Sequence, residues 1–321
     1  VNLVTKSGGN KISGTLDARY SSDSFQSSGD HYDPALQETS FETFDVTLGG
    51  PILRDRLWYF LAYRLVRSSR TPADSPTTRE FDGNYPIAKL TWQVSPKWRA
   101  TGKYSADPAD ITNQNASRFV AEDAGEFQDQ GSRLATFELD AVLSDTVIWN
   151  TVVGSFNSKL DSYPTSGDLE AIQHWDIVTG YQYNNFRSQQ YSKRDRIDAA
   201  TNLTWFVNDL AGSHEFKAGL GYQKLDFEFS SCSTGTSGGE TCAEGVSGLF
   251  FQELPGNTPF YMIETISGGT SSSSGTVATA YLQDTWRVTP NVTLKLGVRY
   301  DGATFDNDTG EQIADLPKWQ P

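Results

Sequence analysis

Apolar and polar residues alternate in single steps along much of this sequence. Between residues 292 and 300 every second residue is apolar, and Thr, Lys, Gly and Arg stand between them. Successive side chains of an extended strand point to opposite faces, so this pattern gives a strand one apolar and one polar face. The same period recurs in other segments, at 12–20, 44–48, 135–143, 197–207 and 216–222. Because no segment of similar length has a helical period, the sequence predicts an all-β protein.

Turn-forming residues divide the chain into about eleven predicted strands. Several of these strands are longer than the usual five or six residues. Gly, Pro, Asn and Asp are common at the breaks between them, as they are in tight turns. The predicted strands cover roughly 11–20, 40–48, 56–68, 84–94, 97–105, 131–143, 147–157, 189–207, 213–230, 276–288 and 291–303.

The connections between these strands alternate in length. The short ones lie at 49–55, 95–96, 144–145, 208–212 and 289–291. The long ones are polar and lie at about 21–39, 69–83, 106–130, 158–188 and 231–275. Short turns at one end, long loops at the other and alternating strands are typical of a transmembrane β-barrel, in which lipid contacts one face. We therefore predict an antiparallel up-and-down transmembrane β-barrel.

The composition agrees with such a barrel and excludes other classes. The chain has 321 residues, only 37% of them hydrophobic, and its longest nearly pure apolar run is 57–63, too short for the roughly 20 residues of a membrane-spanning helix. A formal net charge of −14 argues against nucleic-acid binding, which needs a basic face.

Aromatic residues make up 12% of the sequence and gather near the ends of the predicted strands. Such positions fit the aromatic girdles of a barrel at the two membrane interfaces. A soluble β-sandwich or repeat protein, with the aromatics in its core, remains the alternative at this point. The aromatic residues concerned are Tyr20, Phe41, Trp58, Tyr59, Trp92, Trp98, Tyr104, Trp149, Trp205, Tyr222, Trp286 and Tyr300.

Three stretches resemble TonB-dependent outer-membrane transporters, specifically the Oar-like branch. Residues 1–14 (VNLVTKSGGNKISG) are similar to the end of a plug domain that runs into the first barrel strand. Residues 49–60 (GGPILRDRLWYF) are similar to the first periplasmic turn and the strand after it, and 280–301 (AYLQDTWRVTPNVTLKLGVRYD) to a mid-barrel hairpin. The first two together are fairly specific, whereas the third is common across the wider superfamily.

The resemblance implies a domain organisation and a function. Residues 1–10 would end the plug and link it to the barrel, 11–303 would form barrel strands with short periplasmic turns and long extracellular loops, and 304–321 would begin a further extracellular loop. The implied function is energised import of a scarce or large substrate across the outer membrane of a Gram-negative bacterium. The implied partners are the TonB complex, reached through a region upstream of Val1, outer-membrane lipid and lipopolysaccharide, and an unidentified cargo.

Other functions stay open at the level of sequence. A non-transporting surface or adhesion β-barrel would share the same strand pattern, and so would a secreted β-rich protein that binds carbohydrate. The N-terminal residue is Val1 and an odd number of strands is predicted. Because single-chain bacterial barrels have an even number of strands, we expect this chain to be about half of a larger plugged barrel.

No residue pattern predicts enzyme chemistry, a cofactor or a metal site. His31, His174 and His214 have no partner at the spacing of a zinc site or a catalytic triad. The segment 306–311 (DNDTGE) is only weakly similar to a calcium loop, and a solvated acidic turn is the preferred interpretation. We therefore expect no enzyme activity.

Three local features carry further expectations. Cys232 and Cys242 share one Ser- and Gly-rich segment, which suggests a disulfide in an oxidising compartment. The cluster at 193–196 (KRDR) is interpreted as a strand end in the headgroup zone, with contact to lipopolysaccharide phosphates as the alternative. The alternation at the last hairpin predicts which side chains face lipid and which face the lumen. We expect lipid-facing Leu294, Leu296 and Val298, and luminal Lys295 and Arg299.

Overall fold

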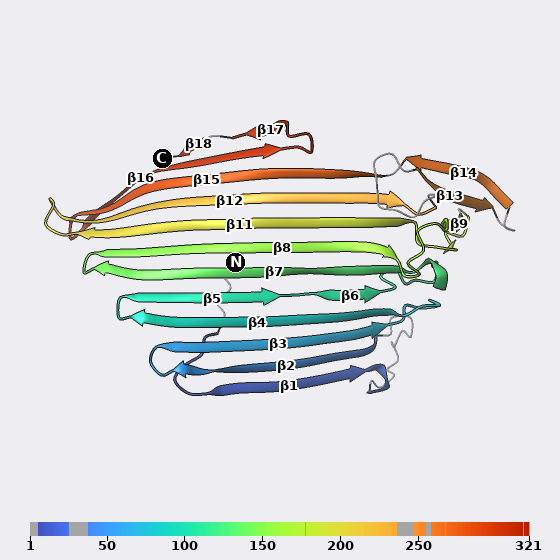
Figure 1. Ribbon diagram of the computed structural model, residues 1–321, viewed down its shortest axis with the longest axis horizontal. Coiled ribbons are helices and arrows are strands. Elements are labelled where there is room, and N and C mark those ends of the chain that lie inside the picture. The colour runs from blue at the N-terminus through green and yellow to red at the C-terminus, as the bar shows by residue number, and fades with distance from the viewer. Residues whose placement is uncertain are drawn as a thin grey trace.

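A long, curved antiparallel sheet dominates the structure. The computed structural model describes residues 6–25, 38–176, 178–235, 247–254, 258–266, 268–316 and 318–320. Within these ranges the strands form one 14-stranded sheet and a separate four-stranded sheet (Figure 1). No helix in these ranges is both long enough and apolar enough to cross a membrane.

Eleven positions of the large sheet follow one another in chain order, and they match the eleven predicted strands. Each position pairs antiparallel with the next, from β1 to β16, and the short β6 (Ala109–Thr112) extends the position of β5 by pairing with β4 and β7. The prediction of an up-and-down antiparallel architecture is thus confirmed. The long strands are β1 (Ser13–Ser22), β2 (Glu38–Leu53), β3 (Leu57–Arg70), β4 (Arg79–Ser95), β5 (Trp98–Ala106), β7 (Glu126–Ser144), β8 (Val147–Pro164), β11 (Ser188–Val207), β12 (Ser213–Ser233), β15 (Gly268–Thr289) and β16 (Val292–Asp306).

The two ends of the large sheet differ in their connections. At one end, which we call the turn end, the strands are joined by connections as short as 54–56, 96–97 and 145–146. At the other, the loop end, longer segments such as 107–125 and 165–187 connect them (Figure 1). The alternation of short and long connections expected from the sequence is therefore present.

Cross-strand partners place the side chains on two chemically distinct faces, because residues paired across an antiparallel ladder share a face. One row runs from Tyr59 through Leu90, Gly102 and Phe137 to Val153. We call the face that carries this row the apolar face and the opposite one the polar face. The polar face carries Asp17, Asp45, Arg64, Lys103, Glu138, Asn150, Asp198, Lys217, Lys295 and Arg299.

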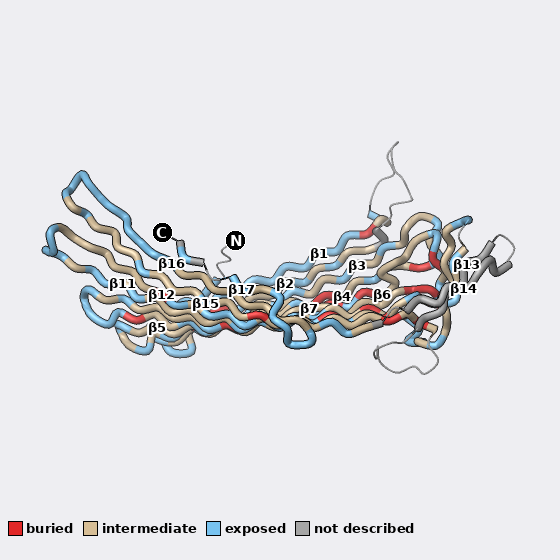
Figure 2. Tube along the Cα trace, turned by 90° about the horizontal axis from the view of Figure 1, so that it is seen from above, coloured by how far each residue is buried: buried red, intermediate tan, exposed pale blue. Residues whose placement is uncertain are grey.

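The apolar face is open, and little of the described chain is buried (Figure 2). Leu220, Leu282 and Leu296 are 62%, 55% and 57% exposed. A soluble protein rarely exposes a contiguous apolar surface of this kind, because water contact with it is unfavourable. The exposed leucines thus disfavour the soluble β-sandwich alternative.

Two long loops meet at the loop end and form the four-stranded sheet. The loop before β11 contributes β9 (His174–Asp176) and β10 (Gln182–Tyr183), and the loop after β12 contributes β13 (Ser247–Leu254) and β14 (Thr258–Ile266). β9 pairs parallel with β13, so segments far apart in the sequence are joined. The loop between β6 and β7 contacts this sheet through the bridge from Val120 to Gln182. Together they form an ordered platform at the loop end.

The chain beyond β16 differs from the expectation of a loop over 304–321. β16 continues to Asp306, and after a turn at 307–311 the strands β17 (Gln312–Asp315) and β18 (Lys318–Gln320) pair back against it. The turn is tight because the Oδ1 of Asn307 accepts hydrogen bonds from the backbone N–H of Thr309 and of Glu311, at 3.1 and 2.8 Å. Gly310 follows with a left-handed φ of 75°.

Candidate functional site

The apolar face has the height of a membrane. On β11 the residues that share this face run from Ile197 to Val207, ten steps of about 3.3 Å or about 33 Å along the strand. A strand tilt of about 40° projects this length to about 25 Å, the height of the lipid-facing band of outer-membrane barrels. Beyond Ile197 the same face becomes charged, with Asp195 and Lys193 at 3.0 Å from each other.

Tryptophans form a rim on the apolar face near the turn end. The rings of Trp98 and Trp149 meet edge to face at 5.9 Å, and Trp149 Nε1 donates a hydrogen bond to Thr201 Oγ1 at 2.7 Å. Trp286 Nε1 donates to the carbonyl of Ala211 in the turn before β12, at 3.0 Å. Amphipathic rings with a satisfied N–H suit a membrane interface, so these residues match the predicted girdle.

Two aromatic residues expected in the girdle lie on the opposite face. Trp58 pairs with Thr91 on the polar face, next to Tyr59, which is on the apolar face. Phe41 pairs with Ser68 and also falls on the polar face. The expectation counted aromatics near strand ends without following the side-chain alternation, which places adjacent residues on opposite faces.

His214 lies in the same rim, with both ring nitrogens in hydrogen-bond contacts. Its Nδ1 lies 2.7 Å from Asp284 Oδ2 and its Nε2 lies 2.9 Å from the carbonyl of Leu210. Both neighbours are acceptors, so the doubly protonated ring satisfies both contacts. Stacking on Phe216 and Trp286, at 5.2 and 5.3 Å, makes the residue part of the interfacial rim.

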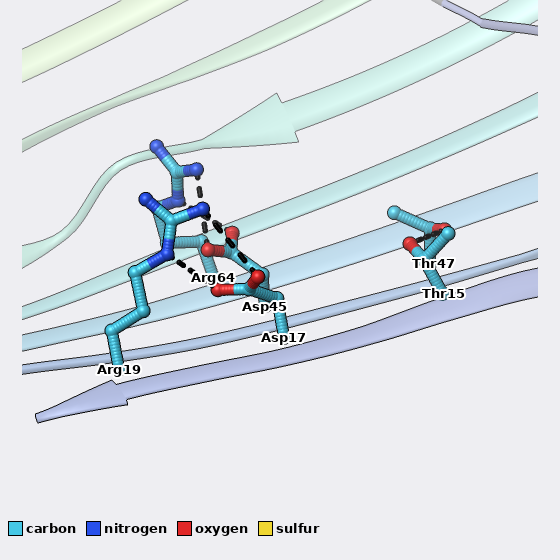
Figure 3. A network of polar contacts seen from close by, with 6 residues as sticks. All are labelled: Thr15, Asp17, Arg19, Asp45, Thr47 and Arg64. Atoms are coloured by element: carbon cyan, nitrogen blue, oxygen red, sulfur yellow. Dashed lines mark hydrogen bonds and ion pairs between the residues drawn. The ribbon is translucent and has the colours of Figure 1, made fainter.

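Ion pairs line the polar face on the first three strands (Figure 3). Asp17 and Asp45 stand directly opposite each other on β1 and β2, an arrangement of like charges that is unfavourable alone. Arg19 Nε binds Asp17 at 2.8 Å, and Arg64 binds both oxygens of Asp45, at 2.5 and 3.2 Å. Each carboxylate thus has its own guanidinium, on a face that remains open to solvent.

The segment before β1 crosses β2 and β3 at the turn end, in a contact that we call the glycine clasp. A Cβ on Gly8 would lie 2.1 Å from the carbonyl oxygen of Tyr59, and one on Gly50 would lie 2.9 Å from Ile12 Cγ1. The crossing therefore requires glycine, which permits this close backbone approach. It joins the first two stretches on which the family resemblance rests.

Asn10 fastens the glycine clasp. Its Oδ1 accepts hydrogen bonds from Trp58 Nε1 at 2.8 Å and from the backbone N–H of Asp55 at 2.9 Å. Its Nδ2 donates to the carboxylate of Asp55. Trp58, whose face is set by its pairing with Thr91, thus has an acceptor for its indole N–H.

A pocket of about 310 Å³ lies at the loop end of the polar face. Its side chains come from two neighbouring rows of the ladder. One row runs across the strands through Phe156, Arg196, Leu225, Gly275 and Phe305. The next row pairs Arg194 with Phe227. We call it the Arg–Phe pocket and define it by Phe156, Arg194, Arg196, Leu225, Phe227 and Phe305.

Each arginine of the Arg–Phe pocket lies over a phenyl ring. The Arg194 guanidinium carbon is 5.3 Å from the ring centre of Phe227, and that of Arg196 is 5.6 Å from the ring centre of Phe156. Both distances are within the range of cation–π attraction. Arg196 also binds Asp198 at 2.8 Å, whereas no carboxylate among the described residues forms an ion pair with Arg194.

The charged cluster at 193–196 is therefore divided between two faces. Arg194 and Arg196 belong to the polar face, and Lys193 and Asp195 to the apolar face beyond the membrane-high band. Asp195 is held there by Lys193 at 3.0 Å and by Asn157 Nδ2 at 2.8 Å. The sequence interpretation treated the four residues as one headgroup cluster, which the alternation of the strand does not allow.

The remaining candidates fall in three places. His174 lies in β9, with its ring 5.0 Å from that of Tyr183. Cys232 is buried near the end of β12, but Cys242 and His31 lie outside the described residues, so the disulfide remains a prediction. In the part of the chain that the structure describes, no group of three His, Cys, Asp or Glu side chains is arranged to hold a metal ion.

Comparison with known proteins agrees with this architecture. A family model described as "Outer membrane beta barrel domain" matches residues 4–86 and 73–318. The TonB-dependent transporter Oar of Myxococcus xanthus is 22% identical over 432 residues, an alignment that covers 100% of this chain and 39% of that protein. The resemblance noted in the sequence is thereby confirmed, and the chain spans about two fifths of the length of this relative.

Solved outer-membrane receptors share the fold. BauA, the ferric preacinetobactin receptor of Acinetobacter baumannii, superposes with a TM-score of 0.63 at 11% identity, covering 99% of this chain and 45% of that one. FpvA of P. aeruginosa, solved with a pyoverdine–iron complex, gives 0.62 at 10% identity, covering 98% and 39%. At these identities the similarity shows the fold alone, with the sheet corresponding to part of the wall of a larger barrel.

Proposed function

The chain belongs to the outer membrane beta barrel domain family, and from this premise we propose that it forms part of the wall of a TonB-dependent importer. It is an integral outer-membrane protein of the same class as its transporter relative. In the proposal the apolar face contacts lipid, and the polar face lines the lumen through which a scarce or large substrate passes. Import is driven through TonB, which acts on a region upstream of Val1.

The observation that carries the proposal is the division of one sheet into two faces. A band about 25 Å high exposes leucine and tryptophan, and the reverse of the same strands carries paired arginine and aspartate. Lipid offers no hydrogen bonds, so a wall of this kind needs apolar side chains outside and tolerates charge only inside. Porins would share that property, and the likeness to the Oar transporter favours an energised function.

The proposal also orients the chain. Counted from the N-terminal segment, the turn end lies in the periplasm and the loop end outside the cell, as in barrels with short periplasmic turns. Residues 1–10 would then be the link from a plug to the barrel, and the strands of 11–303 would form the wall. The platform built by β9, β10, β13 and β14 would face the medium.

Lipopolysaccharide is the proposed partner of the charged zone above the band. Lys159 and Lys193 lie on the apolar face just beyond its apolar part, next to Asp129, Asp161 and Asp195. Amine groups at this height would meet the phosphates of the outer leaflet. Their position above the band is the support for this partner.

Uptake measured with and without an energised inner membrane tests the proposed function. Cells carrying the full-length protein would be incubated with a labelled extract of their growth medium, in the presence or absence of a protonophore. Import that depends on the protein and stops when the proton gradient is removed is the expected result. Surface binding that the protonophore leaves unchanged, with no label inside the cell, would instead favour the adhesion alternative.

A further inference from the structure

The Arg–Phe pocket combines positive charge with apolar rings on the face proposed to line the lumen. A guanidinium above a phenyl ring keeps its N–H groups at its edge, where they can bind a carboxylate or a phosphate oxygen in pairs. Phe305 and Leu225 add apolar surface beside the two arginines. The pocket thus offers both an anion site and a flat apolar site within one cavity.

The shape of the pocket depends on one glycine. A Cβ on Gly275 would lie 2.5 Å from Cδ1 of Phe305, so the phenyl ring lies where any other side chain would stand. Gly275 lies inside β15, where glycine weakens a strand and usually marks the close approach of another group. The ring of Phe305 is that group, and it forms one wall of the cavity.

Two acidic residues also line the pocket, but their carboxylates are paired with lysines. Asp195 and Asp226 alternate with the arginines and Phe227 along β11 and β12, and they belong to the opposite face. Each has a lysine there, since Lys193 binds Asp195 at 3.0 Å and Lys224 binds Asp226 at 3.4 Å. Arg194 therefore keeps its charge available on the polar face, although the whole chain carries a net charge of −14.

We propose that the Arg–Phe pocket binds an organic anion that carries an aromatic ring, with Arg194 as the main contact to the anionic group. Arg196, which is held by Asp198, supports this contact with a second guanidinium. The ring of the ligand packs against Phe227 and Phe305. The inference rests on the proposed function in one respect, namely that the pocket lines the path of the cargo, and it names the chemical class that the cargo presents to this wall.

Binding of 4-fluorobenzoate, followed by fluorine NMR on the full-length protein in lipid nanodiscs, tests the pocket. We expect saturable binding that weakens at least tenfold in Arg194→Gln and in Phe227→Ala. Arg64→Gln is the matched control, because it removes a guanidinium from the same polar face. Arg64 lies on β3, far from the pocket, and is paired with Asp45. The variant should leave the affinity unchanged.

A neutral probe separates charge from apolar contact. 4-Fluorobenzyl alcohol has the same ring without the anion, and we expect it to bind at least tenfold more weakly than 4-fluorobenzoate. Equal affinity for both probes, or an Arg194→Gln variant that binds as well as the wild type, would overturn the proposal. Arg194→Lys retains the charge without the planar fork and should have intermediate affinity, which shows that the site still folds.

Failure of this inference and failure of the proposed function give different results. Protonophore-sensitive uptake with no benzoate binding would leave the importer intact and remove only the ligand class. Benzoate binding without energised uptake would keep the pocket and contradict the transport function.

Discussion

Leu296 and Lys295 are neighbours in β16, yet they belong to opposite faces of the sheet, as the alternation predicted. Leu296 pairs with Asp284 and lies between Leu294 and Val298 along the apolar face, and Lys295 pairs with Thr285 on the polar face. Leu296→Arg would place a charge on the lipid-facing side close to the rim at Trp286, and should cost about 1–2 kcal/mol of folding free energy, less than the roughly 2–4 kcal/mol of a midplane site. Lys295→Leu should cost less than about 1 kcal/mol, because the lumen tolerates either side chain.

Urea titration of the full-length protein in lipid vesicles measures both values. The two variants are matched controls for each other, since they change adjacent residues of one strand. If both lost the same stability, the assignment of the two faces to lipid and lumen would fail.

Gly8 and Gly9 are also neighbours with different surroundings. A Cβ on Gly8 meets the backbone of Tyr59, whereas one on Gly9 finds no atom within 4 Å. Gly8→Ala should therefore displace the segment from the glycine clasp and cost about 1–3 kcal/mol, as overpacking does, and Gly9→Ala should be nearly neutral. Asn10→Ala should loosen the same segment by removing its hydrogen bonds to Trp58 and Asp55.

Limited trypsin digestion reports on the clasp, because Lys6 and Lys11 flank it. We expect faster cleavage at these two lysines in Gly8→Ala and Asn10→Ala than in the wild type. Unchanged cleavage in both, or equally fast cleavage in Gly9→Ala, would show that the crossing does not hold the segment in solution.

At the scale of single elements, the strands were the most predictable part. A strand has a period of two, and the turn residues between strands have their own chemistry, so both can be recognised from nearby residues. The alternation at 292–300 is enough to place β16, and Asn291 with Pro290 marks the turn before it. The error over Trp58 came from neglecting that same alternation.

Contacts between distant segments were not predictable in this way. The glycine clasp joins Gly8 to Gly50, and only the register of β1 on β2 brings them together. The Arg–Phe pocket needs the register of four ladders, from β8 to β16. Gly275 gave no signal in the sequence, because the Gly- and Ser-rich run that ends there was assigned to the predicted loop 231–275. The parallel pairing of β9 with β13 leaves no local signal at all.

The loop after β12 carries a prediction about its tip. Cys232 is buried near the end of β12, and we expect it to be joined to Cys242 by a disulfide. Closing so short a loop would stabilise it by only about 2–3 kcal/mol, so the bond should shape the loop and leave the barrel unaffected. A free-thiol assay on unreduced protein from intact cells should find no reactive thiol. Two reactive thiols would contradict the pairing. If the disulfide exists, Cys232→Ser should free the thiol of Cys242 and so add one reactive thiol.

At the scale of the whole molecule, the sheet has open edges. In the described ranges β1 pairs only with β2, and at the other edge only the short β17 and β18 cover part of β16. Unpaired backbone groups at such edges are costly in lipid and promote aggregation in water. Expressed by themselves, residues 1–321 should therefore aggregate or require detergent, which size-exclusion chromatography in buffer would reveal. A monomeric, cooperatively folding protein in plain buffer would contradict both this expectation and the assignment of the apolar face to lipid.

The glycine clasp has a mechanical consequence. Tension on the chain ahead of residue 6 would reach Asn10 and the crossing over β2 and β3 before it reached the first rung of β1, where Ser13 pairs with Gly49. A ladder that is pulled from its end opens one rung at a time, whereas a crossed segment must slide as a unit. The clasp would thus bear a force applied to the chain ahead of it before that force reaches the β1–β2 ladder. The strands of the wall would then keep their pairing while the upstream chain is pulled.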